Sequence, residues 1–204
     1  VGTDEVYGDR DGLPPADEAT AFAPSSPYAA SKAAADLCCF AWARTYGLPV
    51  TVSAGCNTYG PRQHPEKLLP RVLANALEGR PIPLYGDGRQ QRDWIHVSDH
   101  CAAICRILTE AGDNTRWNCG ADCLLSNRAL AERLCTLLRA RIGGEPAGLI
   151  TTAPDRPGHD RRYALDCKRL RQELDWRTQV DLTDGLAATV DWYLSERDWL
   201  LARA

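Results

Sequence analysis

The chain has 204 residues, with a hydrophobic fraction of 44%, a charged fraction of 25% and a net charge of -3. These values are ordinary for a globular protein, and the absence of a basic excess argues against a nucleic-acid-binding protein. No apolar run is long enough to cross a bilayer, and no signal peptide opens the chain. The chain begins at Val1 and contains no methionine, so we expect that it starts inside a longer gene product.

The cysteines indicate a reducing compartment. Nine of them lie between Cys38 and Cys167, and none forms a Cys-x-x-Cys pair, which gives no support to a zinc ribbon or a thioredoxin-like site. Cys38 and Cys39 fall in an apolar helical stretch. Buried thiols in a cytoplasmic protein therefore fit the chain better than a disulfide framework.

The first third of the chain opens with a strand end and a capped helix. Residues 1–8 are typical of a buried strand that runs into a polar loop. Ser26 offers a hydroxyl cap, and Pro27 follows it where its missing N–H costs nothing. We expect a helix from about Tyr28 to Tyr46, ended by Gly47. A strand at 50–54 and a helix at 65–77 follow.

Short strands and helices alternate through the rest of the chain. Strands are expected at 82–85, 94–97, 116–119 and 149–152. Helices are expected at 98–108 with Ser98 as cap, at 126–141 with Ser126 as cap, and at 166–174 and 183–194. This alternation is typical of an α/β fold. No Gly-x-Gly-x-x-Gly turn is present, so the chain lacks the usual means of holding the pyrophosphate of NAD.

Tyr28 and Lys32 form the most informative pair, in the segment Tyr-Ala-Ala-Ser-Lys. A spacing of four residues places both side chains on one helix face. The ammonium then favours the phenolate, and a tyrosine in that form can take a proton from a hydroxyl. Taken alone, such a pair is more often surface decoration.

The second feature is the run Thr3-Asp4-Glu5 at the end of the first strand. Carboxylates at the C-terminal edge of a strand lie where α/β sheets place their active sites. Two acids beside a hydroxyl can supply a general acid, a general base and a hydrogen-bond donor. Taken alone, the run is more often a solvated turn.

Together these segments resemble a known family. Gly-Thr-Asp-Glu-Val-Tyr-Gly at 2–8, the Tyr28–Lys32 segment and Asn-Thr-Tyr-Gly-Pro at 57–61 are similar to extended short-chain dehydrogenase/reductases. Segments 65–68, 92–94 and the long motif at 155–163 narrow the resemblance to the dTDP-glucose 4,6-dehydratase family. The resemblance covers nearly the whole chain. Asp4 and Glu5 are discriminating, because epimerases and decarboxylases of the superfamily usually carry other residues there.

The resemblance implies NAD-dependent dehydration of a nucleoside-diphosphate hexose, most typically dTDP-glucose, to a 4-keto-6-deoxy sugar. In this reaction Tyr28 is the base for the hydroxyl at carbon 4, assisted by Thr3 and Lys32, while hydride passes to NAD. Glu5 then removes the proton at carbon 5, and Asp4 protonates the departing hydroxyl at carbon 6. The hydride returns to carbon 6, so NAD is regenerated.

The resemblance also implies binding residues. Arg92, Arg156 and His159 are similar to residues that hold the nucleotide diphosphate, and the planar arginine fork suits phosphate oxygens. Asn57 is implied to approach both the nicotinamide and the phosphate, and Tyr28 and Lys32 also contact the cofactor. The other implied substrate-binding residues are Lys67, Leu68, Pro83, Tyr85 and Asn118.

The implied organisation has two parts. Residues 1–62 are the C-terminal portion of a Rossmann-like NAD-binding domain with its parallel sheet, and they carry the catalytic residues. Residues 63–204 mainly form a smaller mixed α/β domain that binds the nucleotide sugar, with some segments returning to the Rossmann sheet. Members of the family usually dimerise through a helix pair, so a homodimer is expected for a longer parent protein. We expect the chain alone neither to retain NAD tightly nor to turn over.

Two positions depart from the family pattern, and three other hypotheses about function are considered beside the dehydratase. Gly2 stands where the family usually has Ser, and Thr58 where a second Asn is usual, which puts hydrogen bonding near the cofactor in doubt. One alternative is a nucleotide-sugar epimerase or decarboxylase, and another is a non-catalytic module that binds a nucleotide sugar or a partner subunit. A metal site at His96 and His100 is disfavoured, because the first is expected at a strand end and the second on the next helix. No membrane partner is expected.

Overall fold

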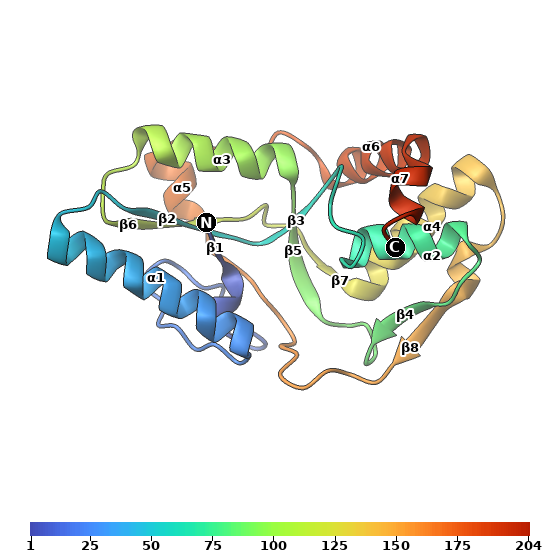
Figure 1. Ribbon diagram of the computed structural model, residues 1–204, viewed down its shortest axis with the longest axis horizontal. Helices are drawn as coiled ribbons and strands as arrows, with labels where there is room; N and C mark the ends of the chain where they lie inside the picture. The colour runs from blue at the N-terminus through green and yellow to red at the C-terminus, as the bar shows by residue number, and fades with distance from the viewer. The chain divides into compact units, whose positions relative to one another are not determined.

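The computed structural model describes residues 1–204 (Figure 1). The chain divides into two compact units. Unit 1 contains residues 1–58, 91–124 and 158–179, and unit 2 contains residues 59–90, 125–157 and 180–204. Strands β3 (Asn57–Tyr59) and β7 (Leu124–Ser126) lie where the chain passes from one unit to the other.

Unit 1 is built on a parallel sheet in the order β1-β2-β6, formed by β1 (Gly2–Thr3), β2 (Thr51–Gly55) and β6 (Thr115–Cys119). The register pairs Thr3 with Gly55 and Gly55 with Cys119. Since the strands are parallel, their carboxyl ends lie at one edge of the sheet. A 3-10 helix, η1 (Asp4–Tyr7), follows β1 directly at that edge.

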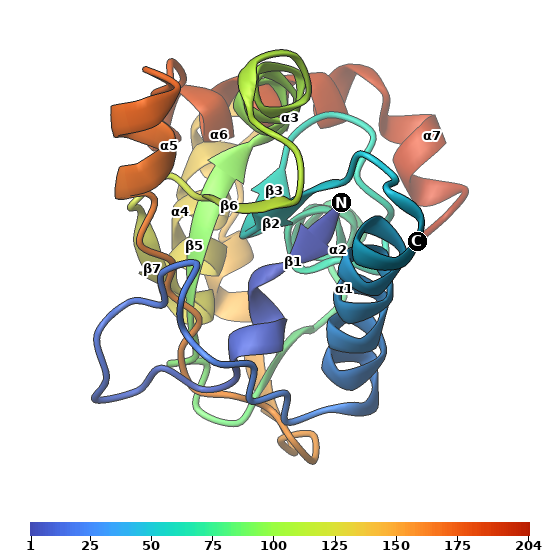
Figure 2. The same ribbon diagram turned by 90° about the vertical axis from the view of Figure 1, so that its left-hand side faces the viewer.

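Helices cover both faces of this sheet. Helix α1 (Pro27–Tyr46) packs against β1 and η1, whereas α3 (Val97–Glu110) packs against β2 and β6 on the other face (Figure 2). The short helix α5 (Lys168–Glu173) packs against β6, and strand β5 (Gln91–His96) contacts α3. The core between these elements is apolar and includes Val6, Ile95 and Trp117.

Unit 2 combines a short sheet with a group of helices. Strand β4 (Ile82–Tyr85) pairs in parallel with β8 (Ile150–Ala153), in the register Ile82 to Ile150. Helices α2 (Leu68–Leu77), α4 (Asn127–Ile142) and α6 (Leu182–Ser195) pack on one another, and α7 (Arg197–Leu201) packs on α2 and α6. The 3-10 helix η2 (Pro146–Leu149) precedes β8. Along β4, Ile82 and Leu84 are buried, so Pro83 and Tyr85 share the exposed face.

Most expected elements are confirmed, and the α/β class with parallel strands is among them. Ser26 caps α1 by accepting a hydrogen bond from the Ala29 amide, and Ser126 caps α4 in the same way. The expected cap at Ser98 is wrong: the ring of His96 accepts from the Ser98 amide, and the helix begins at Val97. The helix expected from Pro65 begins only at Leu68, and α7 was not expected.

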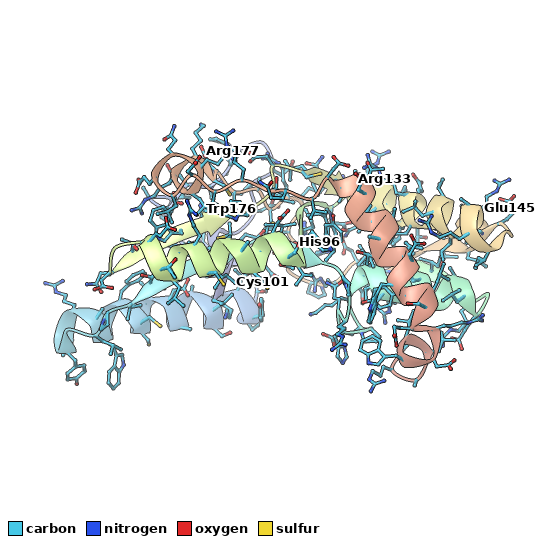
Figure 3. All side chains as sticks on the ribbon, turned by 90° about the horizontal axis from the view of Figure 1, so that it is seen from above. His96, Cys101, Arg133, Glu145, Trp176 and Arg177 are labelled. Carbon is cyan, nitrogen blue, oxygen red and sulfur yellow. The ribbon has the colours of Figure 1, made fainter.

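The expectation of buried thiols is wrong for four of the nine cysteines. Cys38 and Cys39 on α1 and Cys101 and Cys105 on α3 are exposed, although all nine are free thiols. Helix α1 faces the sheet with three alanines and Asp36, so its larger apolar residues point away from the sheet. Cys101 lies on the outer side of α3 (Figure 3). None of the helices is long and apolar enough to span a membrane.

The cap of α1 yields a stability prediction. We expect Ser26→Ala to lower the free energy of unfolding by about 1 kcal/mol, because the Ala29 amide loses its acceptor at the helix start. Urea denaturation followed by circular dichroism measures this change. Ser31→Ala is the matched control, since the Ser31 hydroxyl only donates to the Tyr28 carbonyl inside the same helix. Equal losses in both variants would contradict the capping role.

Candidate catalytic site in unit 1

The turn after β1 holds the predicted catalytic run Thr3-Asp4-Glu5. The Thr3 hydroxyl accepts a hydrogen bond from the Glu5 amide at 3.3 Å and donates to Asp4 Oδ1 at 3.3 Å. Gly8 ends the turn with φ of 69°, and a Cβ there would lie 2.1 Å from the Ala23 carbonyl oxygen. Only glycine fits at this position, so the turn is fixed at both of its ends.

Asp4 is a buried carboxyl group without a cationic partner in hydrogen-bond contact. Asp4 is 4% exposed, and its Oδ2 atom has no hydrogen-bond partner. Desolvation, together with the neighbouring charge of Glu5, raises the pKa of Asp4 to about 7. Arg92 acts in the opposite direction, and Asp93 adds to the rise. Asp4 is therefore about half protonated at neutral pH and largely protonated below it, and in the protonated form its free Oδ2 can donate a hydrogen bond.

Glu5 lies beside Tyr163, whose hydroxyl is held by a hydrogen bond to another carboxylate. The Tyr163 hydroxyl lies 3.5 Å from Glu5 Oε2 and donates to Asp160 Oδ2 at 2.8 Å. Asp160 Oδ2 also accepts from the Ser25 hydroxyl, in the loop before α1. Desolvation and the Asp160 hydrogen bond raise the pKa of Tyr163 well above its usual range, so it stays a neutral donor. Glu5 thus has a fixed phenol next to its carboxylate.

Sequence reasoning gave no role to Tyr163, Asp160 or Asp93. The first two lie within the quoted 155–163 motif, so that motif was the signal that could have found them. Asp93 is 1% exposed and accepts from the Ala121 and Cys123 amides at 2.9 and 2.7 Å. Asp93 lies in the Arg-Asp-Trp segment that carries the resemblance, but the effect of its charge on the pKa of Asp4 depends on the fold and not on sequence spacing.

Tyr28 and Lys32 lie on α1, which packs against η1 and β1. Tyr28 is 54% exposed, while Lys32 is half-buried and donates to the Val1 carbonyl oxygen at 3.0 Å. Asn57 begins β3, two residues after the carboxyl end of β2. The elements that carry these three residues therefore gather around the carboxyl edge of the β1-β2-β6 sheet, where Thr3-Asp4-Glu5 also lies.

Arg92 and Asn118 belong to unit 1 but are buried. The Arg92 guanidinium donates to the carbonyl oxygens of Gln91 and Asp160 at 2.7 and 3.0 Å and stacks 4.2 Å from the Tyr163 ring centroid. The Asn118 side chain accepts from the Tyr7 hydroxyl at 2.9 Å and donates to the Ala16 carbonyl oxygen at 2.9 Å. In this structure both side chains therefore bind protein groups.

The remaining predicted binding residues are divided between the units. His159 lies in unit 1 and is half-buried, whereas Arg156 lies in unit 2 and is exposed. The others in unit 2 are Lys67, Leu68, Pro83 and Tyr85. Lys67 precedes α2 and pairs with Glu66 at 3.0 Å, and Pro83 and Tyr85 share one face of β4. The predicted catalytic residues all belong to unit 1, whereas the predicted binding residues are divided between unit 1 and unit 2.

No group of three or more His, Cys, Asp or Glu side chains is placed to hold a metal ion. His96 Nδ1 lies 2.7 Å from the Ser98 hydroxyl, at the junction of β5 and α3 (Figure 3). His100 Nδ1 lies 2.7 Å from the Thr58 hydroxyl. The two histidines therefore bind separate hydroxyl groups.

Comparison with known proteins identifies the family. The sequence profile described as GDP-mannose 4,6 dehydratase matches residues 1–189. The chain belongs to this 4,6-dehydratase family. The dTDP-glucose 4,6-dehydratase of Xanthomonas campestris pv. campestris (strain B100) is 46% identical over 204 residues, which are 98% of this chain and 58% of that protein. The Neisseria gonorrhoeae dTDP-glucose 4,6-dehydratase is 47% identical over 97% of this chain and 59% of its own length. The predicted resemblance is confirmed.

Solved structures of this 4,6-dehydratase family share the fold. A dTDP-glucose 4,6-dehydratase from Bacillus anthracis str. Ames, in complex with NAD, matches with a TM-score of 0.90 and 42% identity over 97% of this chain and 61% of that one. DesIV from Streptomyces venezuelae, with NAD and TYD bound, matches with a TM-score of 0.90 and 43% identity over 97% and 60%. The chain thus spans about three fifths of the length of these relatives.

The fold extends beyond 4,6-dehydratases. A UDP-glucuronic acid 4-epimerase from Bacillus cereus matches with a TM-score of 0.86 at 23% identity, over 96% of this chain and 60% of that one. Such a match shows the fold alone. The chemistry of this member of the family therefore has to be argued from Asp4, Glu5 and their surroundings.

The raised pKa of Asp4 yields a prediction about stability. An unfolded aspartate releases its proton near pH 4, whereas folded Asp4 keeps its proton up to about pH 7. The folded state binds more protons in that window, so this group lowers stability as the pH rises through it. We expect Asp4→Asn to be close to the native protein in stability near pH 4 and more stable, by on the order of a few kcal/mol, near pH 8.

Asp9→Asn is the matched control for this measurement by urea denaturation. Desolvation raises the pKa of Asp9, but hydrogen bonds from backbone amides, first that of Arg161, outweigh it and lower the pKa. Asp9 therefore stabilises the fold above its unfolded pKa, and this contribution is lost as the pH falls. The variant should be less stable near neutral pH, with a deficit that shrinks in acid. A stability difference for Asp4→Asn that does not change with pH would contradict the assignment.

Proposed function

We propose that the protein to which this chain belongs catalyses the NAD-dependent conversion of dTDP-glucose to the 4-keto-6-deoxy sugar with loss of water. The observation that carries the proposal is the pairing of a protonated, buried Asp4 with Glu5 one residue later. An elimination needs one acid that holds a proton and one base that takes a proton. Burial supplies the first without any metal or external acid.

In the first half of the proposed reaction, Tyr28 removes the proton from the hydroxyl at carbon 4 of the sugar. Lys32 lies four residues further along the same helix, where its ammonium stabilises the phenolate. For Thr3 to assist by donating a hydrogen bond to the same oxygen, its hydroxyl would have to exchange its present bond to Asp4 Oδ1. Bound NAD supplies the hydride acceptor for carbon 4 and later the hydride donor for carbon 6.

In the second half, Glu5 takes the proton at carbon 5, which the ketone at carbon 4 has acidified. Asp4 delivers its proton from Oδ2 to the departing hydroxyl at carbon 6, so water leaves. The Tyr163 hydroxyl, 3.5 Å from Oε2, could hold the Glu5 carboxylate in place if its proton turned from Asp160 to Glu5. Glu5 would return its proton to carbon 5 of the new C=C bond, while the bound cofactor would supply the hydride for carbon 6.

The residues of the chain fit one side of an NAD site. The carboxyl edge of a parallel sheet is where α/β folds bind dinucleotides, and the elements that carry Tyr28, Lys32 and Asn57 lie there. The unpartnered Asp4 Oδ2 fits a sugar hydroxyl next to such a cofactor. We assign Tyr28, Lys32 and Asn57 to the cofactor, and unit 1 to the Rossmann-like NAD-binding domain.

Unit 2 is assigned to the nucleotide sugar. The exposed face of β4 offers apolar surface for a nucleotide at Pro83 and Tyr85. The start of α2 adds a further apolar side chain, Leu68, and one cation, Lys67. Arg156 and His159 are assigned to the diphosphate, because their side chains suit phosphate oxygens. For Arg92 to bind a phosphate, it would have to exchange its present carbonyl partners.

An epimerase or decarboxylase needs no acid that protonates a hydroxyl leaving carbon 6. The proposal therefore predicts that Asp4→Asn and Glu5→Gln in the complete gene product each lower kcat on dTDP-glucose by about 100-fold or more. The reason is that the acid or the base of the elimination is lost while substrate contacts stay. The alkaline absorbance of the 4-keto product measures turnover.

Glu132→Gln, on the exposed face of α4, is the matched control and should turn over like the native protein. Epimerised dTDP-hexose from the native protein, or native turnover by Glu5→Gln, would contradict the proposal. Binding of dTDP-glucose without product in the native protein would favour a non-catalytic module.

The chain of 204 residues has its own expected behaviour. It carries no glycine-rich pyrophosphate turn, so we expect it to bind NAD at least about 100-fold more weakly than the complete gene product and to show no turnover. Isothermal titration with NAD tests this expectation on both proteins. Stoichiometric NAD retained by the purified 204-residue chain would overturn it.

A further inference from the structure

Arg116 is a buried charge of unit 1 with contacts to two other elements, and neither the motifs nor the proposed reaction uses it. It lies on β6 and is 7% exposed. We propose that Arg116 is a positioning residue that fixes the helix of Tyr28 and Lys32 relative to the turn of Asp4 and Glu5. This inference rests on the proposed function for its catalytic meaning, and on the contacts below for its geometry.

The first connection runs from Arg116 to α1. Its Nη1 atom donates to Asp36 Oδ2, and both partners of this ion pair are buried. Asp36 follows Tyr28 by eight residues and Lys32 by four, so the three side chains lie on one side of the helix. Holding Asp36 therefore sets the rotation of α1 about its axis, and with it the direction in which Tyr28 and Lys32 point.

The second connection runs from Arg116 to η1. Its Nε atom donates to the Tyr7 hydroxyl at 3.0 Å, and the guanidinium carbon lies 5.1 Å from the Tyr7 ring centroid. Tyr7 is the last residue of the turn that begins with Asp4 and Glu5. The Tyr7 hydroxyl in turn donates a hydrogen bond to Asn118 Oδ1 at 2.9 Å, and Asn118 lies on the same strand as Arg116. One guanidinium thus joins the helix of the base to the turn of the two acids.

Strand β1 packs directly against the Asp36 carboxylate of this ion pair. A Cβ atom on Gly2 would lie 3.3 Å from both carboxylate oxygens of Asp36 and 3.2 Å from the Ser53 carbonyl oxygen. Glycine at this position leaves room for the Asp36 carboxylate directly against the strand that leads into Thr3. The three elements that carry the proposed acid–base groups therefore converge on Arg116 and Asp36.

Stability alone does not account for this arrangement. A buried ion pair often gains less from attraction than it loses in desolvation, and here the Arg116 Nη2 atom is buried without a hydrogen-bond partner. An apolar pair of similar volume would avoid both costs. What an apolar pair would not supply is the directed bonds that tie α1 to η1.

The experiment separates positioning from stability. It compares the complete gene product, loaded with NAD, with Asp36→Leu, Arg116→Met and the double variant Asp36→Leu/Arg116→Met. Each single variant leaves an unpaired buried group and should be strongly destabilised. The double variant removes both charges and should recover stability. Glu145→Leu/Arg139→Met is the matched control, since it removes an exposed ion pair of unit 2.

For the double variant we expect kcat on dTDP-glucose to fall by about 10-fold or more while KM changes by less than about 2-fold, because the acid–base groups are displaced and the substrate contacts are not. We also expect faster amide hydrogen exchange in residues 4–7 and 27–32 than in the native protein. The control variant should show neither change.

Recovery of native kcat together with stability in the double variant would overturn the inference. So would unchanged amide exchange in both segments. If the native protein does not convert dTDP-glucose, the proposed function fails, and the exchange measurement still decides whether Arg116 couples α1 to η1.

Discussion

The site depends on the burial of one carboxyl group at the end of a two-residue strand. Asp4 lies on the turn after β1 with no cation in hydrogen-bond contact, so removal from water outweighs the attraction of Arg92 and raises its pKa to about 7. A carboxylic acid that keeps its proton near neutral pH is a donor where an ordinary aspartate is only an acceptor. Glu5 follows directly, and its partner Tyr163 is a neutral phenol.

Several contacts in unit 1 fix the position of the turn that carries Asp4 and Glu5. The hydrogen bonds of Thr3 and the glycine at position 8 fix the ends of η1, and Tyr7 passes the constraint on to β6. Arg92 braces the segment that carries Tyr163, because its guanidinium binds the backbone carbonyls of Gln91 and Asp160 and stacks on the Tyr163 ring. Arg92 thus stabilises the fold, and its charge offsets only part of the rise in the pKa of Asp4.

The sequence could predict those features that depend on local geometry. The strand end predicted the turn that carries Asp4 and Glu5, the four-residue spacing predicted that Tyr28 and Lys32 share one face of a helix, and Ser26 marked the start of α1. Features that depend on distant contacts were not predictable in this way. The Asp36–Arg116 pair joins residues 80 positions apart, and the Asp160 and Tyr163 contacts bring the last third of the chain to its first residues. The exposure of Cys38 and Cys39 likewise depends on which face of α1 meets the sheet.

The most direct test of this account is the titration of Asp4 itself. In the native protein, the carboxyl carbon of Asp4, assigned with the Asp4→Asn variant, can be followed by carbon-13 NMR as the pH is changed. The account predicts a midpoint near pH 7, with the neutral form dominant at lower pH. A midpoint near pH 4, where an exposed aspartate titrates, would show that burial does not hold the proton, and Asp4 would then lose the role of acid.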